Sequence, residues 1–223
     1  MIIGFVGFIG AGKGTAADYL VREHGFIKES FANSVKDSVS VIFGWDRKML
    51  EGATPESRLW REQPDPWWSN NLNRPFSPRL ALQLMGTEAG RNVFDDKLRI
   101  YSTFKRMTPW NNYVIADVRF QNEIEEIKKN GGIIIRVKKG SNPIWFDTAY
   151  KQNTTPDDQL WILQENGELM EQKYPEVHYS EWAWVGSQDI DYVILNNNTI
   201  EKLEEEMEKL LPLCGIAYYN SGS

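Results

Sequence analysis

A glycine-rich segment near the amino terminus has the residue types and spacing that bind phosphate groups. Residues 7–15 read Gly-Phe-Ile-Gly-Ala-Gly-Lys-Gly-Thr and follow directly on the apolar run Ile2 to Val6. Glycines let successive backbone N–H groups turn inward around an anion, and the positive end of a following helix adds to the attraction. Lys13 can reach the outer phosphates of a nucleotide. We therefore predict a phosphate-binding loop for a nucleoside triphosphate.

The residue after the loop lysine narrows the class of enzyme. Many phosphate-binding loops place serine or threonine directly after the lysine to hold Mg²⁺. Here Gly14 has that place and the hydroxyl comes one residue later, at Thr15. This Gly-Lys-Gly-Thr variant resembles adenylate-kinase-like small-molecule kinases. We expect Thr15 to contact a phosphate oxygen, and Mg²⁺ to be held mainly by phosphates and water.

Two charged residues follow a second apolar run that starts at Tyr113. Asp117 ends this predicted strand, and Arg119 comes two residues later. Ligands of open α/β sheets bind at the carboxyl ends of the strands, and phosphoryl transfer depends mainly on positioning and positive charge. We expect Asp117 to orient magnesium-bound water or a substrate hydroxyl, and Arg119 to face a phosphate. A helix cap or a surface ion pair is the structural alternative.

Alternating apolar and amphipathic segments predict the elements that position these residues. Strands are predicted at Ile2 to Val6, Phe26 to Phe31, Tyr113 to Asp117, Ile133 to Val137 and Tyr192 to Leu195. Helices are predicted at Lys13 to Glu23, Ala32 to Phe43, Pro78 to Val93 with a break at Gly86, Asp96 to Met107, Glu123 to Lys129 and Ile200 to Leu211. Such repetition predicts right-handed crossovers. The expected fold is a three-layer α/β P-loop kinase fold, with a mostly parallel five-stranded sheet and helices on both faces.

The predicted organisation is one kinase domain, residues 1–213, followed by a tail at 214–223. Residues of about 45–78 are rich in proline and aromatic side chains without sustained periodicity, and we interpret them as a substrate-cover insertion around short helices. After Lys139 the chain loosens until Tyr192. Residues of about 138–186 are interpreted as a lid-like region.

Composition excludes several other classes of protein. A net charge of −6 over 223 residues leaves no basic nucleic-acid footprint, and one cysteine with two histidines gives neither a disulfide framework nor a zinc site. No signal peptide or membrane span is evident. We expect a cytoplasmic protein (host cytoplasm for a viral one) with small-molecule nucleotide partners and no direct nucleic-acid or membrane partner; a homodimer stays open. The nine tryptophans are interpreted as mainly structural.

Five short motifs occur in an order that points to one family. They are Ser77-Pro-Arg79, Leu82 to Glu88 with Gly90-Arg91, Asp117 to Glu123, Gly131 to Val137, and His178-Tyr-Ser-Glu181. Together with Phe31-Ala and Lys36-Asp37, they span nearly the whole chain up to about Leu211. In this order they resemble the deoxynucleoside monophosphate kinases of tailed bacteriophages. The resemblance implies ATP-dependent phosphorylation of a deoxynucleoside 5′-monophosphate to the diphosphate, with Mg²⁺, for viral DNA synthesis.

The resemblance also implies roles for individual residues. The donor phosphates would be held by Gly10, Ala11, Gly12, Lys13, Gly14 and Thr15. Acceptor phosphate and transition-state charge would be clamped by Arg79, Arg91 and Arg119, with a contribution from Lys36. Glu88 would accept from a base or ribose, or fix a loop. Arg136 and Lys138 would close over ATP, or else form a solvated basic turn. His178 and Glu181 would belong to a lid or contact a nucleotide, with structural packing as the alternative for His178. Asn196 would lie near the adenine or cap the next helix.

Other functions remain open from the residues alone. Another small-molecule kinase, acting on dephospho-coenzyme A or phosphomevalonate, could share the loop and the sheet. A nucleotide-dependent switch that transfers no phosphate is a second alternative, although a guanine-reading Asn-Lys-x-Asp motif is absent and several arginines suit an acceptor pocket better. Phage enzymes of this type often carry aspartate where this chain has Gly14, which gives Asp117 more weight in organising the metal. Base preference and ribose selectivity are not predicted.

Overall fold

The computed structural model describes residues 1–216, with residues 87, 88, 91 and 92 described by their backbone only. The chain divides into two compact units. Unit 1 combines Met1–Glu29 with Thr108–Ser223, and unit 2 is Ser30–Met107. The predicted phosphate-binding loop belongs to unit 1.

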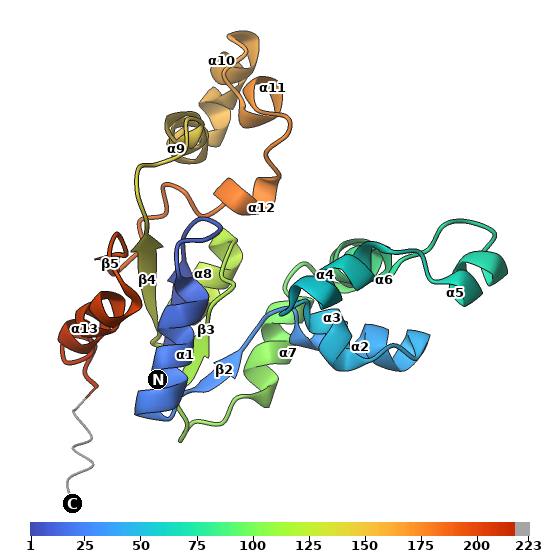
Figure 1. Cartoon of the computed structure of the whole chain (residues 1–223). Helices are drawn as coiled ribbons and strands as arrows, with labels where there is room; N and C mark the ends of the chain where they lie inside the picture. Colours follow the sequence, from blue (N-terminus) through green and yellow to red (C-terminus); the bar gives the residue numbers. More distant parts are fainter. Residues whose placement is uncertain (217–223) are drawn as a thin grey trace, which may run out of the picture. The chain divides into compact units, whose positions relative to one another are not determined.

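Unit 1 is built on a parallel sheet, drawn as arrows in Figure 1. Within the described residues its five strands are β1 (Ile2–Val6), β2 (Ile27–Glu29), β3 (Tyr113–Ile115), β4 (Ile133–Lys138) and β5 (Tyr192–Leu195). Their order is β2-β3-β1-β4-β5, and every neighbouring pair is parallel. The central strand β1 pairs Ile3 with Val114 on one side and Gly4 with Ile134 on the other. The predicted five-stranded α/β fold is confirmed.

Helices cover both faces of this sheet. On one face, α1 (Lys13–His24) packs against β1, β2 and β3, and α13 (Ile200–Leu210) packs against α1 and β5. On the other face, α8 (Gln121–Lys129) packs against β1 and β4. Ile3 and Phe5 are fully buried in the core beneath α1 and α13. A Cβ at Gly4 would lie 2.8 Å from Cδ1 of Ile127, so the missing side chain lets α8 approach closely.

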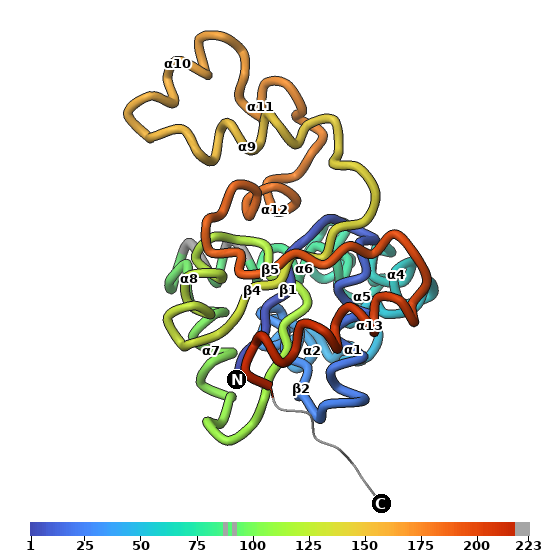
Figure 2. Tube along the Cα trace, turned by 90° about the vertical axis from the view of Figure 1, so that its left-hand side faces the viewer, coloured from blue at the N-terminus to red at the C-terminus, as the bar shows by residue number. Residues whose placement is uncertain are grey.

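The segment between β4 and β5 contains short helices, so the predicted loose stretch after Lys139 is wrong. The elements are α9 (Phe146–Thr154), η2 (Asp157–Gln159), α10 (Leu160–Glu165), α11 (Met170–Lys173) and α12 (Tyr179–Trp182). Figures 1 and 2 show α9, α10 and α11 beyond the carboxyl ends of the strands. Each helix is too short to produce a sustained apolar period, so packing between them decides their formation. Ala149, Leu163 and Met170 are buried there.

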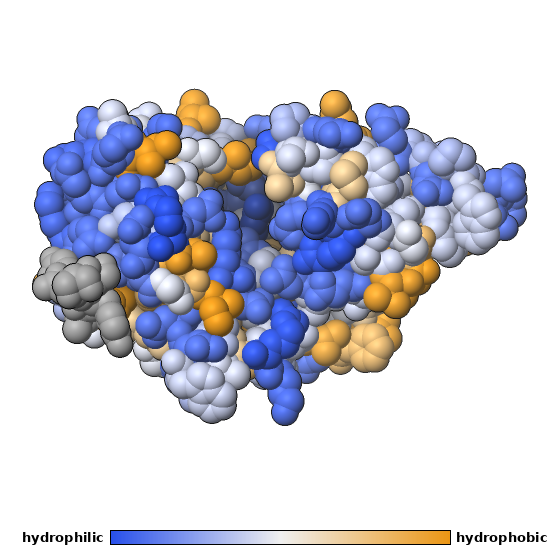
Figure 3. Space-filling model, turned by 60° about the horizontal axis from the view of Figure 1, so that its bottom comes forward, coloured by the Kyte–Doolittle hydropathy of each residue, from blue (hydrophilic) through white to orange (hydrophobic). Residues whose placement is uncertain are grey.

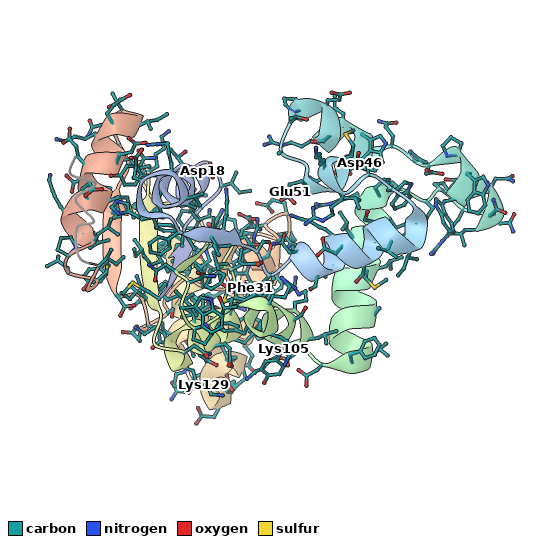
Figure 4. The ribbon with its side chains drawn as sticks, turned by 90° about the horizontal axis from the view of Figure 1, so that it is seen from below. Asp18, Phe31, Asp46, Glu51, Lys105 and Lys129 are labelled. Atoms are coloured by element: carbon teal, nitrogen blue, oxygen red, sulfur yellow. The ribbon has the colours of Figure 1, made fainter. Side chains whose placement is uncertain are left out.

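Unit 2 is helical in its described residues. Its elements are α2 (Asn33–Phe43), α3 (Arg47–Glu51), α4 (Pro55–Glu62), α5 (Pro66–Asn71), α6 (Pro78–Gln83), the π-helix η1 (Leu84–Phe94) and α7 (Leu98–Arg106). Side-chain caps start several of them; Asp46, labelled in Figure 4, accepts from the backbone N–H of Lys48 and Met49. Val39, Trp45, Leu50, Phe76 and Ala81 form its core.

The predicted helix over Pro78 to Val93 continues through Gly86 instead of breaking there. Helix α6 passes directly into π-helix η1. Gly86 is buried, and a Cβ added to it would lie 3.7 Å from Cγ1 of Val35. Close packing with α2 offsets the entropic cost of a glycine in a helix. The break predicted from the glycine is therefore wrong.

The carboxyl-terminal end packs further than the predicted boundary at residue 213. Cys214 is buried, in the core beneath α13, while residues 217–223 lie outside the described part.

None of the described helices is long and apolar enough to cross a membrane. Hydrophilic residues make up most of the face drawn in Figure 3, where hydrophobic residues form small separate groups.

Candidate functional site

The phosphate-binding loop connects the end of β1 to the start of α1, and two glycines set its shape. Gly7 has φ 143°, and a Cβ there would overlap the carbonyl oxygen of Val137 on β4. Gly12 has φ 101°, and a Cβ there would overlap the side-chain amide of Asn196. Other residues rarely adopt these angles and would not fit the space. Glycine at both positions therefore allows the backbone of the loop to follow this path.

Lys13, the first residue of α1, is folded back onto the loop. Its Nζ donates to the carbonyl oxygens of Gly7, at 2.6 Å, and Phe8, at 2.9 Å. Burial and then the nearby Arg119 lower the pKa of Lys13 from 10.5 to about 8, against the raising effects of Glu181 and Asp117. The amine is therefore still mainly protonated near pH 7 and can attract an anion.

Lys13, Asp117, Arg119 and Glu181 form one electrostatic cluster at the carboxyl edge of the sheet, since the three others all act on the lysine. Arg119 donates from Nη1 to Oε1 of Glu181, at 2.8 Å, and its side chain is 44% exposed. Its backbone N–H donates to Oε2 of the buried Glu123, at 2.8 Å, which fixes the turn before α8. Asp117 and Arg119 therefore lie near the loop, as predicted.

His178 caps the short helix α12 that carries Glu181. Its Nδ1 accepts from the backbone N–H of Ser180, at 3.2 Å, and lies 2.9 Å from Oγ of Ser180. The same hydroxyl lies 3.3 Å from Nη1 of Arg119. The motif from His178 to Glu181 thus contacts Arg119 through Ser180 and Glu181. A nucleotide contact for His178 stays a prediction.

Asn196, which follows β5, lies against the loop. Its Nδ2 donates to the carbonyl oxygen of Ala11, at 2.9 Å, and its backbone N–H donates to the carbonyl oxygen of Lys138, at 2.8 Å. Its neighbour Asn197 accepts through Oδ1 from the backbone N–H of Gly140, at 2.7 Å. These bonds connect the ends of β4 and β5 to the loop. A contact of Asn196 with adenine stays a prediction.

Arg136, on β4, lies in a group of aromatic rings that we call the aromatic cage: Phe8, Trp145, Phe146 and Trp184. Its guanidinium carbon is 5.1 Å from the ring centroid of Trp184 and 5.2 Å from that of Phe146. Nη2 donates to Oδ1 of Asn142, at 3.0 Å. Burial lowers the pKa of Arg136. The guanidinium of Arg136 thus packs among aromatic rings. The expectation that Arg136 and Lys138 close over ATP stays a prediction.

The aromatic cage was missed from the sequence. Phe8 belongs to the loop itself, and its ring centroid lies 5.1 Å from that of Trp145 and 5.0 Å from that of Trp184. The tryptophans were interpreted as structural, which their burial supports for Trp184. Their shared contact with Phe8 could not be inferred from the sequence, because Phe8, residues 145–146 and Trp184 are far apart along the chain.

Thr15 and Asp117 are the residues predicted to hold Mg²⁺ near the loop. No group of three or more histidine, cysteine, aspartate or glutamate side chains that could hold a metal ion occurs among the described residues. Mg²⁺ in nucleotide sites is usually held by one or two carboxylates together with substrate phosphates and water. Thr15 and Asp117, predicted to act through water, supply oxygen of this kind. Binding of Mg²⁺ through these two residues stays a prediction.

One sequence relative decides the family. A protein of Acanthamoeba polyphaga mimivirus, described as a "putative deoxynucleotide monophosphate kinase", is 33% identical over 152 residues, which are 62% of this chain and 74% of that protein. This chain belongs to the deoxynucleotide monophosphate kinase family. The family predicted from the sequence motifs is confirmed, and the chain is a phosphotransferase. No family model matches the chain.

Solved structures are similar to this member of the deoxynucleotide monophosphate kinase family only at a low level. Dephospho-CoA kinase from Campylobacter jejuni is 14% identical, with a TM-score of 0.37 and coverage of 96% of each chain. Shikimate kinase from Aquifex aeolicus is 13% identical, with a TM-score of 0.38 and coverage of 96% of this chain and 97% of the other. TM-scores of this size carry no inference about fold or activity.

The remaining residues predicted for this kinase lie in unit 2. Nζ of Lys36 lies 2.6 Å from Oε1 of Glu51, the residue labelled at the end of α3 in Figure 4. Arg79 lies at the start of α6, where it is more than half exposed, with its Nε 4.0 Å from Oε1 of Glu62. The side chains of Glu88 and Arg91 lie outside the described residues. Acceptor binding by these four residues stays a prediction.

Proposed function

We propose that the chain transfers the γ-phosphate of ATP to the 5′-phosphate of a deoxynucleoside monophosphate and releases the diphosphate and ADP. The observation that carries this proposal is the convergence of Lys13, Asp117, Arg119 and Glu181 beside a glycine loop at the carboxyl edge of a parallel sheet. Membership of the family supports the class of acceptor. In a virus, the product would serve as a DNA precursor.

The loop would bind the donor through backbone N–H groups between Gly10 and Thr15 and through the positive end of α1. Lys13 would exchange the carbonyl oxygens of Gly7 and Phe8 for phosphate oxygens. These carbonyls keep the ammonium at the loop, so little rearrangement is needed on binding. Binding and positioning of the donor therefore follow from the loop geometry.

Arg119 would neutralise the charge that develops on the transferred group. A guanidinium can bind two phosphate oxygens at once, and in phosphoryl transfer such a charge acts mainly in the transition state. Mg²⁺, when bound through Thr15, Asp117 and water, would neutralise the donor phosphates. Lys36, Arg79 and Arg91 are proposed as clamps of the acceptor phosphate.

A coupled assay of ADP release tests this function. ATP, Mg²⁺ and one acceptor at a time are supplied: each deoxy- and ribonucleoside monophosphate, dephospho-coenzyme A and phosphomevalonate. We expect ADP to form in equal amounts with a deoxynucleoside diphosphate. ADP formed only with one of the last two acceptors would replace the proposal with that kinase activity. ATP binding without acceptor-dependent ADP would support a switch.

A further inference from the structure

Helix α12 and the residues after it are attached to the site at two points. Glu181 accepts from Nη1 of Arg119, at 2.8 Å. Three residues later, the ring of Trp184 packs against Phe8 of the phosphate loop, with centroids 5.0 Å apart. The two attachments are joined, because Nε1 of Trp184 donates to the carbonyl oxygen of Glu181, at 3.1 Å. One short segment therefore contacts both Arg119 and the loop that holds Lys13.

Arg119 needs an anion to stay beside Lys13. Both groups are positive, and Arg119 lowers the pKa of Lys13, a sign of repulsion between them. The arginine side chain is long and 44% exposed, so ordering it costs conformational entropy, which its contacts with Glu181 and Ser180 offset. Glu181, with a side chain only 23% exposed, and Asp117 supply the negative charges that oppose this repulsion.

We propose that Glu181 is a positioning residue that holds the guanidinium of Arg119 at the phosphate loop, and that Trp184 fixes Glu181 there. This inference rests on the proposed function. It differs from the substrate contact predicted from the sequence, because a carboxylate beside the donor and acceptor phosphates would repel them. Glu181 acts through Arg119 and touches neither nucleotide.

The first test is a double-mutant cycle. Glu181→Gln removes the charge and keeps the size, and we expect kcat for deoxynucleoside monophosphate phosphorylation to fall about 10-fold while the KM for ATP changes less than about threefold. In an Arg119→Ala background the same substitution should have no further effect on kcat, because the residue on which it acts is gone. Equal losses of kcat in both backgrounds would overturn the proposal.

A matched control and a conservative variant separate this role from structure. Glu176→Gln neutralises an exposed carboxylate shortly before α12 and should leave kcat unchanged. Glu181→Asp retains the charge and should recover part of the kcat that Glu181→Gln loses. If Glu181→Asp and Glu181→Gln lose kcat equally, the negative charge is not the cause and the proposal fails.

A second readout needs no acceptor, so it separates a failure of this inference from a failure of the proposed function. The crystal structure of Glu181→Gln, compared with that of the wild type, shows where the guanidinium of Arg119 lies. We expect the guanidinium to leave its wild-type position once the partner that it contacts at 2.8 Å has lost its charge. A guanidinium that keeps the wild-type position in Glu181→Gln would contradict the positioning role of Glu181.

Trp184 is tested by replacement with phenylalanine. Trp184→Phe keeps an aromatic ring near Phe8 and removes the N–H that donates to the carbonyl oxygen of Glu181. We expect kcat to fall in the same direction as for Glu181→Gln, by a smaller factor, in a variant that is folded at the assay temperature although the smaller buried ring lowers its melting temperature. A wild-type kcat in a folded Trp184→Phe variant would remove Trp184 from the proposal and leave Glu181 to the first test.

Discussion

Asn196 donates a hydrogen bond from its side-chain Nδ2 to the carbonyl oxygen of Ala11, at 2.9 Å. The same amide occupies the space that a side chain at Gly12 would need. The residue after the last strand of the sheet therefore fixes the turn of the phosphate loop just before Lys13. The side-chain amide of Asn196 therefore fits against the loop only because Gly12 has no side chain.

Asn196→Ala should weaken ATP binding without removing the fold. The variant leaves the carbonyl oxygen of Ala11 without its donor and gives the loop more freedom, at a cost of about 1 kcal/mol for the lost bond. We expect affinity for an ATP analogue to fall by about fivefold to tenfold in calorimetry. The exposed Asn198 offers a matched control, and Asn198→Ala should bind as the wild type does. Equal affinity in both variants would show that the bond to Ala11 does not shape the site.

Lys13→Met should abolish transfer and stabilise the fold near pH 7. Burial is the main cause that lowers the pKa of Lys13 from 10.5 to about 8. Between these values the unfolded chain holds more protons than the folded one, so stability rises with pH, and below about pH 8 the folded protein bears the cost of a buried charge. We expect Met to raise the free energy of unfolding by about 1 to 3 kcal/mol at pH 7.

Urea denaturation at pH 7 and pH 9.5 measures this effect. The advantage of Lys13→Met should shrink at the higher pH, where the wild-type amine has lost most of its proton in the folded state. A variant less stable than the wild type at both pH values would show that the bonds of Lys13 to the loop outweigh its burial.

Arg119→Ala should reduce turnover more than ATP affinity. The guanidinium stabilises mainly the negative charge that develops on the transferred phosphate in the transition state. We therefore expect kcat to fall at least about 100-fold and ATP affinity to stay within about threefold. Steady-state kinetics and calorimetry give the two numbers. Lys129, labelled in Figure 4 with a side chain that is 76% exposed on α8, supplies the control Lys129→Ala. Equal losses in binding and turnover would assign Arg119 to the donor.

The sheet and the loop could be predicted because their signals are local. Buried parallel strands are nearly continuous apolar runs, and a glycine-rich turn that carries a lysine between a strand and a helix is typical of phosphate binding. The charged residues after β3 followed from the rule that ligands bind at the carboxyl ends of strands. Asp117 and Arg119 were therefore predicted near Lys13 and are found there.

The contacts that hold the site were not predictable in the same way. The bond from Asn196 to Ala11 joins residues 185 positions apart, and the pair of Arg119 and Glu181 joins residues 62 apart. Short helices between β4 and β5 are stabilised by packing and leave no period in the sequence. Such relationships depend on the folded chain, so residue types alone did not show that Asn196 contacts the loop or that Glu181 pairs with Arg119. The ligand roles expected for both residues stay predictions.

Phe8→Ala should damage both the fold and ATP binding, because Phe8 joins the loop to the aromatic cage. Its ring makes an edge contact with Trp145 and packs against Trp184, and its carbonyl oxygen accepts from Lys13. Each aromatic pair contributes about 0.5 to 1.5 kcal/mol beyond burial. We therefore expect unfolding free energy to fall by about 2 to 3 kcal/mol, with weaker binding of an ATP analogue even where the variant is fully folded.

Ile9→Ala is the matched control for Phe8→Ala, since it truncates the next residue of the same loop, whose side chain is 77% exposed. We expect it to keep both stability and analogue affinity, because it buries little surface and makes no ring contact. Urea denaturation and calorimetry at a temperature well below both transitions measure the two quantities. If Phe8→Ala loses stability but binds as tightly as Ile9→Ala, the aromatic cage supports the segment between β4 and β5 without holding the loop.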